Sequence, residues 1–570
     1  VSTLLILWGI RNFSAVLVCS LVSVITPLFL LKGVRGVLVR SSVILLSCVI
    51  LLLLWNTSLL DRRMTMLNHP NLVESSDSPY GRISVTRLHN QISVFENDAL
   101  AFETEGTESE YFCHLTALQH PNPKNVLILG GGIEGLVREM LKYTPRRIDY
   151  IELNPVLFQL TIQHLPDDIR KSLGNPKVRI VFADPRRYLK ESGSYDLILV
   201  GMPQPSSGQT NRFYTREFFE QCRVKLKPGG ILGLRLHTAE NLWTVPLARR
   251  NTSIYRALQS VFPATLFLPG STNVVTASDV PLPESPDIMS RRLQNRQPAT
   301  RLISKSYIEY LFTNDRYYKI RDLLHHEHAP ANTDIRPVCY PYAIIIWLSQ
   351  FYPRIVLLDP FFVIDRGFLK SSWVWLSCIG FIIFLLVIRV RPALKRIMLV
   401  AAAGFTGMVL ETILILYYQV THGVLYQDIG ILMMSFMAGL AAGAMAIHKK
   451  MSDSMEHRPF KRLYGAFLLI GFCFLCAYTG ITLTMGNSLG LAPISFLLGA
   501  SGFAVGGIFA YASIHKVEDR IKVISPLYAA DLIGGCFGCL LGSLIFIPLA
   551  GMDVTAWGMF LVAALLLILV

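Results

Sequence analysis

The chain has 570 residues, enough for roughly three or four domains of ordinary size. Apolar residues make up 52% of it and charged residues only 16%, against roughly 25% in a typical soluble protein, which excludes a disordered chain and a wholly soluble one. Basic loops beside anionic lipid and cytoplasm explain the net charge of +14. No basic stripe is interleaved with aromatic residues, so we predict membrane lipid as a partner and no nucleic acid.

The first apolar zone covers residues 1–60. Segment 13–31 has no charged residue and segment 41–60 is a second candidate, and both approach the ~20 residues that a spanning helix needs. Neither is followed by a small-residue cleavage site and a polar start, so we expect no cleaved signal peptide. The zone therefore predicts N-terminal transmembrane helices.

Residues 61–340 have the pattern of a soluble α/β region. Two alternating segments predict a small antiparallel β unit within 75–115. From 120 to 340, strand-like and helix-like segments alternate, which predicts a Rossmann-type domain with a doubly wound parallel sheet and a terminal β hairpin. The expected strands are 82–86, 91–95, 125–129, 147–152, 178–182, 196–200, 231–236, 265–268 and 273–277, and the expected helices begin at 133 and 155 or cover 215–226.

Membrane character returns after residue 340. Segment 341–370 is interrupted by Pro353 and Pro360 and predicts an interfacial or re-entrant linker. Residues 371–570 predict a C-terminal bundle of about seven transmembrane helices. The expected spans are 371–388, 397–418, 429–447, 463–484, 491–514, 523–549 and 554–570.

Two CxxC pairs lie inside these spans, Cys473 with Cys476 and Cys536 with Cys539. Redox or metal chemistry is one interpretation of such pairs. No histidine or second pair lies nearby in the sequence, so we expect packing residues and predict no metal site.

A glycine-rich segment, GGGIEG at 130–135, follows the strand expected at 125–129 and opens a helix. Glycines in this position let the backbone approach a ligand, and the helix start offers free N–H groups. The next two strands end in acids, Glu152 and Asp184, which suit the ribose hydroxyls and the adenine amino group of an adenosyl ligand. A tight turn without a ligand, and helix capping by the two acids, are the alternatives. The residues predicted to bind this ligand are Gly130, Gly131, Gly132, Gly135, Glu152 and Asp184.

The segment LKPGG at 226–230 and the terminal hairpin resemble the class I fold that binds S-adenosylmethionine. Four further segments narrow the resemblance to the spermidine synthase (polyamine aminopropyltransferase) family: ILGGG at 128–132, YIE at 150–152, YDLI at 195–198 and YTREFF at 214–219. The flanking apolar zones resemble the membrane-embedded branch of that family. The resemblance implies a transferase of polyamine biosynthesis that uses decarboxylated S-adenosylmethionine as co-substrate.

The chain departs from the family pattern where the amine substrate should bind. The family glycine loop reads GGGDGG. This chain has Ile133 in place of the Asp and Glu134 in place of the Gly that follows it. After the fourth strand the family has two acids that bind the amine and help to deprotonate it, whereas this chain has Gly201 and Gln204. An amine must lose a proton before it attacks, and a glutamine cannot take that proton. We therefore predict an intact adenosyl pocket and a rebuilt acceptor pocket.

Candidate residues for the rebuilt pocket are Gln204, Asn211, Arg212 and Tyr214. Packing of a loop and a helix start is the alternative role for the last three. In the membrane zone, Glu411 and Asp531 are functional candidates because a buried membrane charge is costly. A hydrogen-bonded structural acid is the alternative there. Three GxxxG pairs, at 439–443, 502–506 and 538–542, predict close helix packing.

The distribution of basic residues and the source of the adenosyl donor place the α/β domain on opposite sides of the membrane. Loops 389–396 and 448–462 carry four and five Lys or Arg residues, whereas loop 419–428 has none, which makes the first two cytoplasmic. The α/β domain would then lie outside unless 341–364 crosses the membrane. Adenosyl donors are cytosolic, and on that ground we expect a cytoplasmic domain in a multi-pass protein of the cell membrane.

The leading functional prediction is a membrane-bound transferase that binds decarboxylated S-adenosylmethionine or S-adenosylmethionine. The group moved is aminopropyl, as the resemblance implies, or methyl, and the acceptor is a small molecule such as an amine. The alternative is a membrane carrier or sensor that binds the nucleoside without turnover. The sequence decides neither the acceptor nor the oligomeric state.

Overall fold

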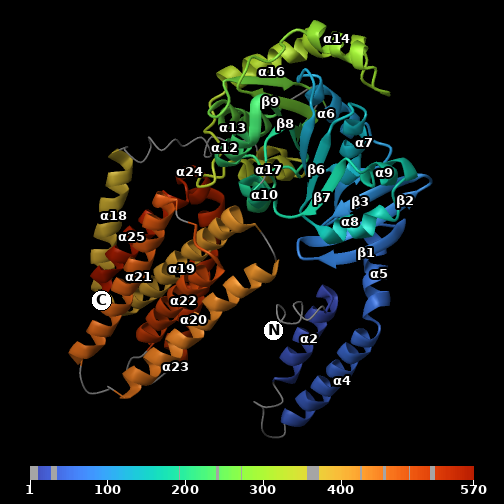
Figure 1. Cartoon of the computed structure of the whole chain (residues 1–570). Coiled ribbons are helices and arrows are strands. Elements are labelled where there is room, and N and C mark those ends of the chain that lie inside the picture. The colour runs from blue at the N-terminus through green and yellow to red at the C-terminus, as the bar shows by residue number, and fades with distance from the viewer. Residues whose placement is uncertain are drawn as a thin grey trace.

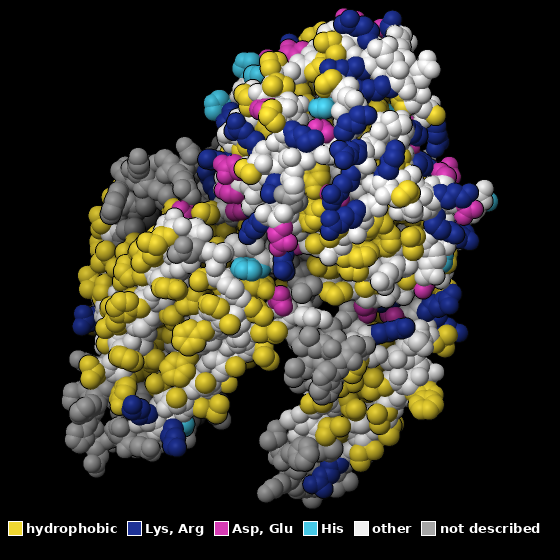
Figure 2. All heavy atoms as spheres, viewed as in Figure 1, with side chains coloured by type: hydrophobic (Ala, Val, Ile, Leu, Met, Phe, Trp, Pro, Cys, Tyr) yellow, Lys and Arg dark blue, Asp and Glu magenta, His cyan; other side chains and the backbone are white. Residues whose placement is uncertain are grey.

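The computed structural model describes residues 10–26, 35–191, 193–238, 243–270, 272–355, 372–423, 426–453, 458–486, 488–513 and 520–570. Figure 1 shows an α/β region with two groups of helices extending from the same side, one near the N-terminus and one near the C-terminus. Hydrophobic side chains gather over both helix groups, whereas charged side chains gather over the α/β region (Figure 2). This distribution is compatible with a multi-pass membrane part that carries an α/β domain outside the bilayer.

The small β unit is a four-stranded antiparallel sheet in the order β1-β2-β3-β4. Its strands are β1 (Leu72–Ser78), β2 (Gly81–Leu88), β3 (Gln91–Glu96) and β4 (Ala99–Glu103). The predicted hairpin is β2 with β3, in which Val85 pairs with Val94 and both are fully buried. The turn between them passes through His89, whose φ of 53° is left-handed.

The second sheet has seven strands in the order β10-β11-β9-β8-β5-β6-β7. Five strands are parallel, and β10 and β11 form the predicted antiparallel hairpin. The chain adds β6 and β7 on one side of β5 and then returns to add β8 on the other, so ligands are expected at the carboxyl ends of β5 and β8. The bounds are β5 (Asn125–Leu129), β6 (Arg147–Glu152), β7 (Val178–Phe182), β8 (Tyr195–Val200), β9 (Leu226–His237), β10 (Ala264–Leu268) and β11 (Thr272–Ser278).

Helices cover both faces of this sheet. They include α6 (Glu108–Ala117), α7 (Leu136–Leu141), α8 (Pro155–Ile162), α9 (Asp167–Leu173), α10 (Pro185–Glu191), α11 (Gly208–Asn211), α12 (Arg216–Lys225), α13 (Val245–Gln259), α14 (Pro286–Arg296), α15 (Lys305–Thr313) and α16 (Asp315–His326). The helix expected from 133 is a short 3₁₀ turn, η1 (Gly132–Glu134), followed by α7, because Gly135 has a φ of 119° and interrupts the helix.

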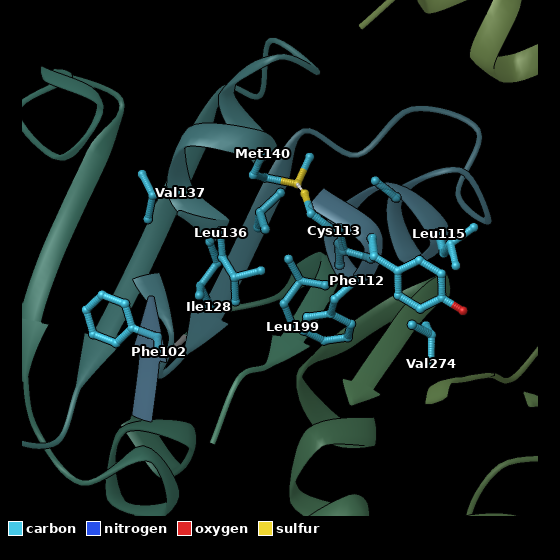
Figure 3. Close-up of a cluster of buried hydrophobic side chains, with 14 of the residues drawn as sticks. Phe102, Phe112, Cys113, Leu115, Ile128, Leu136, Val137, Met140, Leu199 and Val274 are labelled. Atoms are coloured by element: carbon cyan, nitrogen blue, oxygen red, sulfur yellow. Dashed lines mark hydrogen bonds between the residues drawn. The ribbon is translucent and has the colours of Figure 1, made fainter. Parts of the chain in front are cut away.

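Alternate residues of the central strands enter two separate cores. Ile128 of β5 and Leu199 of β8 are fully buried on one face, among side chains of α6 and α7 such as Phe112 and Met140 (Figure 3). Their chain neighbours, including Leu129, are fully buried on the other face. Both faces of these strands are covered, which explains why they read as continuous apolar runs in the sequence.

The N-terminal helices are α2 (Asn12–Ile25), α4 (Arg35–Trp55) and α5 (Thr57–Asn68). Residues 27–34, which include the end of the predicted span 13–31, lie outside the described residues. The second predicted span, 41–60, ends earlier, because the chain bends by 78° between α4 and α5. Helix α5 is polar and is held on the β unit by Asp61, whose two oxygens accept hydrogen bonds of 2.7 and 2.9 Å from Arg82.

The C-terminal bundle consists of α18 (Ser372–Arg389), α19 (Pro392–His422), α20 (Tyr426–Asp453), α21 (Arg458–Met485), α22 (Leu491–Ser513), α23 (Arg520–Leu541), α24 (Ile547–Ala550) and α25 (Met552–Leu565). Among the described residues, six spans are long and apolar enough to cross a membrane, and they correspond to the six spans expected from 397 onward. The first predicted span falls on α18, in which Ile379–Arg389 forms a shorter apolar helix.

Glycines bring α20 and α22 into backbone contact. A Cβ added to Gly439 or Gly443 of α20 would lie 2.0 or 2.1 Å from a backbone oxygen of α22. A Cβ added to Gly502 or Gly506 of α22 would lie 2.1 or 2.2 Å from one of α20. The predicted role of these GxxxG pairs in helix packing is confirmed.

The α/β domain rests on the ends of the bundle helices. The Arg336 side chain donates a 3.0 Å hydrogen bond to the Pro548 carbonyl, and the Met552 N–H donates one of 2.9 Å to the Ile335 carbonyl. Helix α17 (Cys339–Ser349), in the predicted linker, packs on α13 through its buried first half. Residues 356–371 of that linker lie outside the described residues.

Candidate functional site

A cavity of about 700 Å³ opens at the carboxyl ends of β5, β6 and β8. This is the position where the strand order predicts a ligand, and the volume lies within the usual range for ligand sites. Its wall includes two of the four predicted glycines, Gly130 and Gly131, together with Glu152 and the altered positions Gly201 and Gln204. The structure therefore brings Gly130, Gly131 and Glu152 into one cavity with Gly201 and Gln204.

The glycine loop approaches the cavity with its backbone. Gly130 and Gly131 both have a φ of 72°, a left-handed conformation that glycine adopts without strain. Gly132 has a different role, since a Cβ there would lie 2.5 Å from the Tyr150 ring. Gly132 and Gly135 are not among the described residues that line the cavity.

Glu152 stands at the end of β6 and is 5% exposed. Its carboxylate accepts a hydrogen bond from the Tyr150 hydroxyl and one of 3.0 Å from the Asn154 N–H. Burial raises the pKa of Glu152 to about 7. A carboxylate held this way in the cavity wall suits the hydroxyl groups of a ribose.

Asp184 is placed differently from the prediction. Its Oδ1 accepts hydrogen bonds from the N–H groups of Arg186 and Arg187 at 2.9 and 3.2 Å, so it caps the start of α10. The same oxygen accepts a 2.7 Å hydrogen bond from Arg212, which is 2% exposed. Asp184 is not one of the described cavity-lining residues, and its geometry matches the helix-capping alternative.

The backbone at Gly201, one of the two positions predicted to lack a family acid, lies against the glycine loop. A Cβ added to Gly201 would lie 2.6 Å from the Gly130 carbonyl oxygen, closer than real contacts allow. An aspartate at this position would therefore require the glycine loop to move.

Gln204, the other position predicted to lack a family acid, faces a cation. Its Oε1 accepts a 3.1 Å hydrogen bond from Arg250, which is 4% exposed. Arg250 also donates to the His237 carbonyl at 2.9 Å, and no described carboxylate pairs with it. Burial lowers the pKa of Arg250. An acid at 204 would bind this buried guanidinium instead of a substrate amine.

Glu134, which replaces a family glycine, places a carboxylate beside the vacated position. Its Oε2 lies 3.4 Å from the point where a Gly131 Cβ would stand, and the Gly201 Cα lies at the same distance from that point. Glu134 forms an ion pair with Arg235, whose side chain also donates a 3.3 Å hydrogen bond to the Gly201 carbonyl. Burial raises the pKa of Glu134 and Arg235 opposes that rise.

The other acceptor candidates, Asn211, Arg212 and Tyr214, are buried outside the cavity wall. The Tyr214 hydroxyl donates a 2.9 Å hydrogen bond to the Met202 carbonyl, and Tyr214 and Asn211 are fully buried. Neither they nor Arg212 is among the described lining residues, where Phe213 is found. The loop-packing alternative describes their positions.

Sequence reasoning missed several residues of the cavity wall, namely Tyr80, Glu96, Arg235, Gln419 and Ile429. Glu134 was visible as a departure from the glycine pattern but carried no predicted role. The last two belong to the membrane helices α19 and α20, and no local signal links them to the cavity.

The membrane acids lie outside this cavity. Glu411 is 4% exposed within α19, and its Oε2 has no hydrogen-bond partner among the described residues. Asp531 of α23 faces α19, since a Cβ added to Gly404 would lie 2.7 Å from its Oδ1. Within the described ranges, no group of three or more His, Cys, Asp or Glu residues could hold a metal ion.

The sheet order, the glycine loop and Glu152 together define a class I-type α/β domain with a nucleoside-sized site. A family profile described as Spermine/spermidine synthase domain matches residues 105–263. The polyamine aminopropyltransferase of Clostridium perfringens (strain SM101) is 31% identical over 194 residues, which are 33% of this chain and 67% of that protein. The chain belongs to the spermidine synthase family.

Other relatives match over a smaller share of their length. The polyamine aminopropyltransferase of Oceanobacillus iheyensis is 29% identical over 193 residues, which are 32% of this chain and 38% of that protein. The solved spermidine synthase from Thermotoga maritima has a TM-score of 0.39 at 19% identity and covers 45% of this chain and 88% of its own. This chain thus spans less than half of the Oceanobacillus relative.

Proposed function

We propose that the chain is a membrane-bound transferase whose α/β domain binds decarboxylated S-adenosylmethionine or S-adenosylmethionine. The observation that carries this proposal is the cavity at the carboxyl ends of β5, β6 and β8, with Glu152 in its wall beside Gly130 and Gly131. The glycine backbone leaves room for the nucleoside, and Glu152 accepts hydrogen bonds from its ribose. The six long apolar spans support the membrane part of the proposal.

The transfer itself needs a nucleophile in line with a carbon next to the sulfonium. The electrophile is reactive by itself, so the protein's task is to orient both partners and to exclude water. The acceptor is not a simple diamine, because Gly201 and Gln204 replace the acids that the family uses. A Cβ at Gly201 would collide with the Gly130 carbonyl, and an acid at 204 would pair with Arg250 instead of an amine. The group moved is aminopropyl, as family membership favours, or methyl.

A second candidate, nucleoside binding without turnover, is favoured by the same lack of room for an acid at Gly201. If no acceptor is alkylated, the retained Glu152 would serve a sensor coupled to the bundle. Detection of methylthioadenosine or S-adenosylhomocysteine formed from a bound donor separates the two functions.

Calorimetric titration of the full chain in detergent with S-adenosylmethionine, its decarboxylated form and methylthioadenosine tests the binding step. We expect sub-millimolar affinity for at least one of them. Glu152→Gln should weaken that binding by about 1.5–3 kcal/mol, the scale for a hydrogen bond to a charged group. Glu220→Gln, an exposed acid paired with Arg216 on α12, is the matched control. Millimolar or weaker binding of all three compounds would contradict the proposal.

We also propose that the α/β domain faces the cytoplasm, where its donor is made. Helix α19 runs about 45 Å from Pro392 to His422, and a Cβ added to Gly423 would lie 2.8 Å from Asp184 Oδ2 of the domain, so loop 389–396 lies at the opposite end of the bundle. The basic residues of that loop favour the reverse orientation. Labelling of a cysteine introduced at Arg391 with a membrane-impermeant reagent in intact cells decides between the two: labelling supports a cytoplasmic domain, and protection contradicts it.

A further inference from the structure

The membrane bundle forms part of the cavity wall. Gln419, near the end of α19, and Ile429, near the start of α20, line the cavity together with the loop 206–210. That loop presses directly on α19, because a Cβ added to Gly208 would lie 2.4 Å from Leu416 Cδ1 and 3.4 Å from Gln419 Oε1. The cavity wall near Gly201 and Gln204 is therefore completed by membrane helices.

Helix lengths place this wall at the level of the lipid headgroups. Leu416 follows Arg396 by twenty residues, or about 30 Å of helix, which is the thickness of the hydrocarbon core. Gln419 lies one turn beyond it. On α20, Ile429 precedes Lys449 by the same twenty residues, so Ile429 marks the same boundary.

Aromatic side chains near the junction agree with this depth. Trp347, Phe351 and Tyr352, at the end of α17, are 59–68% exposed. Helix α17 also packs on α11, which is part of the cavity loop region. Exposed aromatic residues of this kind are typical of the membrane–water interface.

The cavity wall holds a third acid, Glu96, which has a side-chain hydrogen bond with Asn154. Glu134 is neutralised by Arg235, and Glu152 is held by Tyr150 and Asn154. Glu96, at the end of β3, lines the cavity and forms no ion pair within the described part of the chain. Burial raises the pKa of Glu96, which favours a carboxylate that can take up a proton. One acid suits a single amine, whereas a free diamine has two charges to balance.

We infer that the acceptor is the primary amine of a membrane lipid headgroup, which enters past Gln419 and Ile429 while its acyl chains stay in the bilayer. This inference rests on the proposed transferase function. The amine lone pair forms a bond to the donor carbon next to sulfur, and the carbon–sulfur bond breaks. Its electron pair converts the sulfonium to a neutral thioether. The proton lost by the nitrogen passes to Glu96 and then to water.

The test uses the full chain in nanodiscs of phosphatidylcholine with or without phosphatidylethanolamine. Each sample receives decarboxylated S-adenosylmethionine or S-adenosylmethionine, and lipid extracts are analysed by mass spectrometry. We expect an alkylated headgroup only where phosphatidylethanolamine is present, formed at least about tenfold faster than alkylated putrescine or free ethanolamine.

Matched variants locate the entry route. Ile429→Trp should narrow it and reduce the lipid product by about tenfold or more, with the donor Kd unchanged. Met433→Trp, one turn along α20, 48% exposed and not among the described lining residues, is the control and should retain the lipid product.

The outcomes separate the two proposals. Absence of donor binding overturns the transferase proposal and this inference with it. Donor binding with an unmodified lipid, with equal alkylation of soluble amines, or with equal loss in both tryptophan variants overturns the lipid acceptor and leaves donor binding standing.

Discussion

The cavity has a donor half, which keeps the residues expected of the family, and an acceptor half, which does not. In the donor half, Gly130, Gly131 and Glu152 hold the geometry that an adenosyl ligand needs. In the acceptor half, Gly201 and Gln204 are the positions where we predict that family acids are missing, and both have close neighbours. A lost side chain alone would leave a hole or an unpaired partner. Here a Cβ at Gly201 would collide with the Gly130 carbonyl, and Gln204 binds Arg250, as expected if the acceptor half has been rebuilt as a unit.

The sharpest test of this contrast is the reaction of the simple diamine. Loss of a general base typically costs 10²–10⁴-fold in rate. We expect putrescine and decarboxylated S-adenosylmethionine to react well below about 1 per second, the lower end of ordinary enzyme turnover. Quantitation of spermidine formed by the purified full chain is the measurement.

The double variant Gly201→Asp/Gln204→Asp serves as the companion experiment. We expect no recovery, because the first side chain would collide with the Gly130 carbonyl and the second would pair with Arg250. A gain of about a hundredfold or more in spermidine formation would show that only the two side chains had changed and that the acceptor half had kept its family form.

The next largest effect concerns the ion pair that the acceptor half has gained. Glu134 and Arg235 are 13% and 7% exposed, and removal of one partner of a buried pair costs about 3–5 kcal/mol. Glu134→Gln should therefore lower the free energy of unfolding of the α/β domain strongly. Denaturant unfolding of the full chain in detergent measures it.

The exposed pair of Arg216 with Glu220 provides the control. Its side chains are 53% and 48% exposed, so Glu220→Gln should cost about 0.5 kcal/mol or less. Equal midpoints for Glu134→Gln and Glu220→Gln would mean that the buried pair does not hold the rebuilt half together.

A change in pH should have a moderate effect on the affinity of the donor half for its ligand. The pKa of Glu152 is raised to about 7, so the carboxyl is mostly protonated at pH 6 and mostly ionised at pH 8. A cationic sulfonium donor favours the ionised form, and affinity should rise about tenfold across that interval. Stability changes in the opposite direction: the folded domain binds more protons than the unfolded chain between pH about 4.5 and 7, so stability falls as pH rises through that window.

Titration of the donor in buffers of different ionisation enthalpy checks this pH dependence. Proton release should accompany binding near pH 7 and should disappear in Glu152→Gln. A flat affinity between pH 6 and 8 in the unaltered chain would show that Glu152 does not change its charge at the donor site.

The donor half was also the more predictable half. Strands 125–129, 147–152 and 178–182 were predicted with the observed bounds, because they alternate with helical segments, and the first of them is also a nearly continuous apolar run buried on both faces. Glu152 followed from its place at a strand end. Helix capping by Asp184 was the stated alternative, but its ion pair with Arg212 did not follow, since Arg212 reaches it across the fold.

The membrane side of the acceptor half could not be predicted from local pattern. Gln419 and Ile429 are more than two hundred residues from Gln204 in the sequence and meet it only at one cavity. The bend within the span predicted over 41–60 was missed for a related reason, because α5, which follows Asn56, is held on the β unit by the contact of Asp61 with Arg82. Long-range contacts of this kind leave no periodic signal.

The smallest expected effect comes from the hydroxyl that supports Glu152. Tyr150 donates to the Glu152 carboxylate, and Tyr150→Phe keeps the ring that packs against Gly132 while removing that hydrogen bond. The donor affinity should fall by about 0.5–1.5 kcal/mol, roughly two- to tenfold. The hydroxyl also favours the ionised carboxylate, so its loss should raise the Glu152 pKa further and move the midpoint of the affinity profile above pH 7.

Tyr195→Phe is the matched control for this variant. Its hydroxyl also donates to a buried acid of β6, Asp149, at 2.8 Å, but at the end of the strand away from the cavity. That variant should leave the midpoint of the donor profile where it is. A merely structural role of Tyr150 would weaken binding at every pH without moving the midpoint, whereas a role through Glu152 moves it. The shift in the midpoint therefore tests whether the donor half works through the ionisation of Glu152.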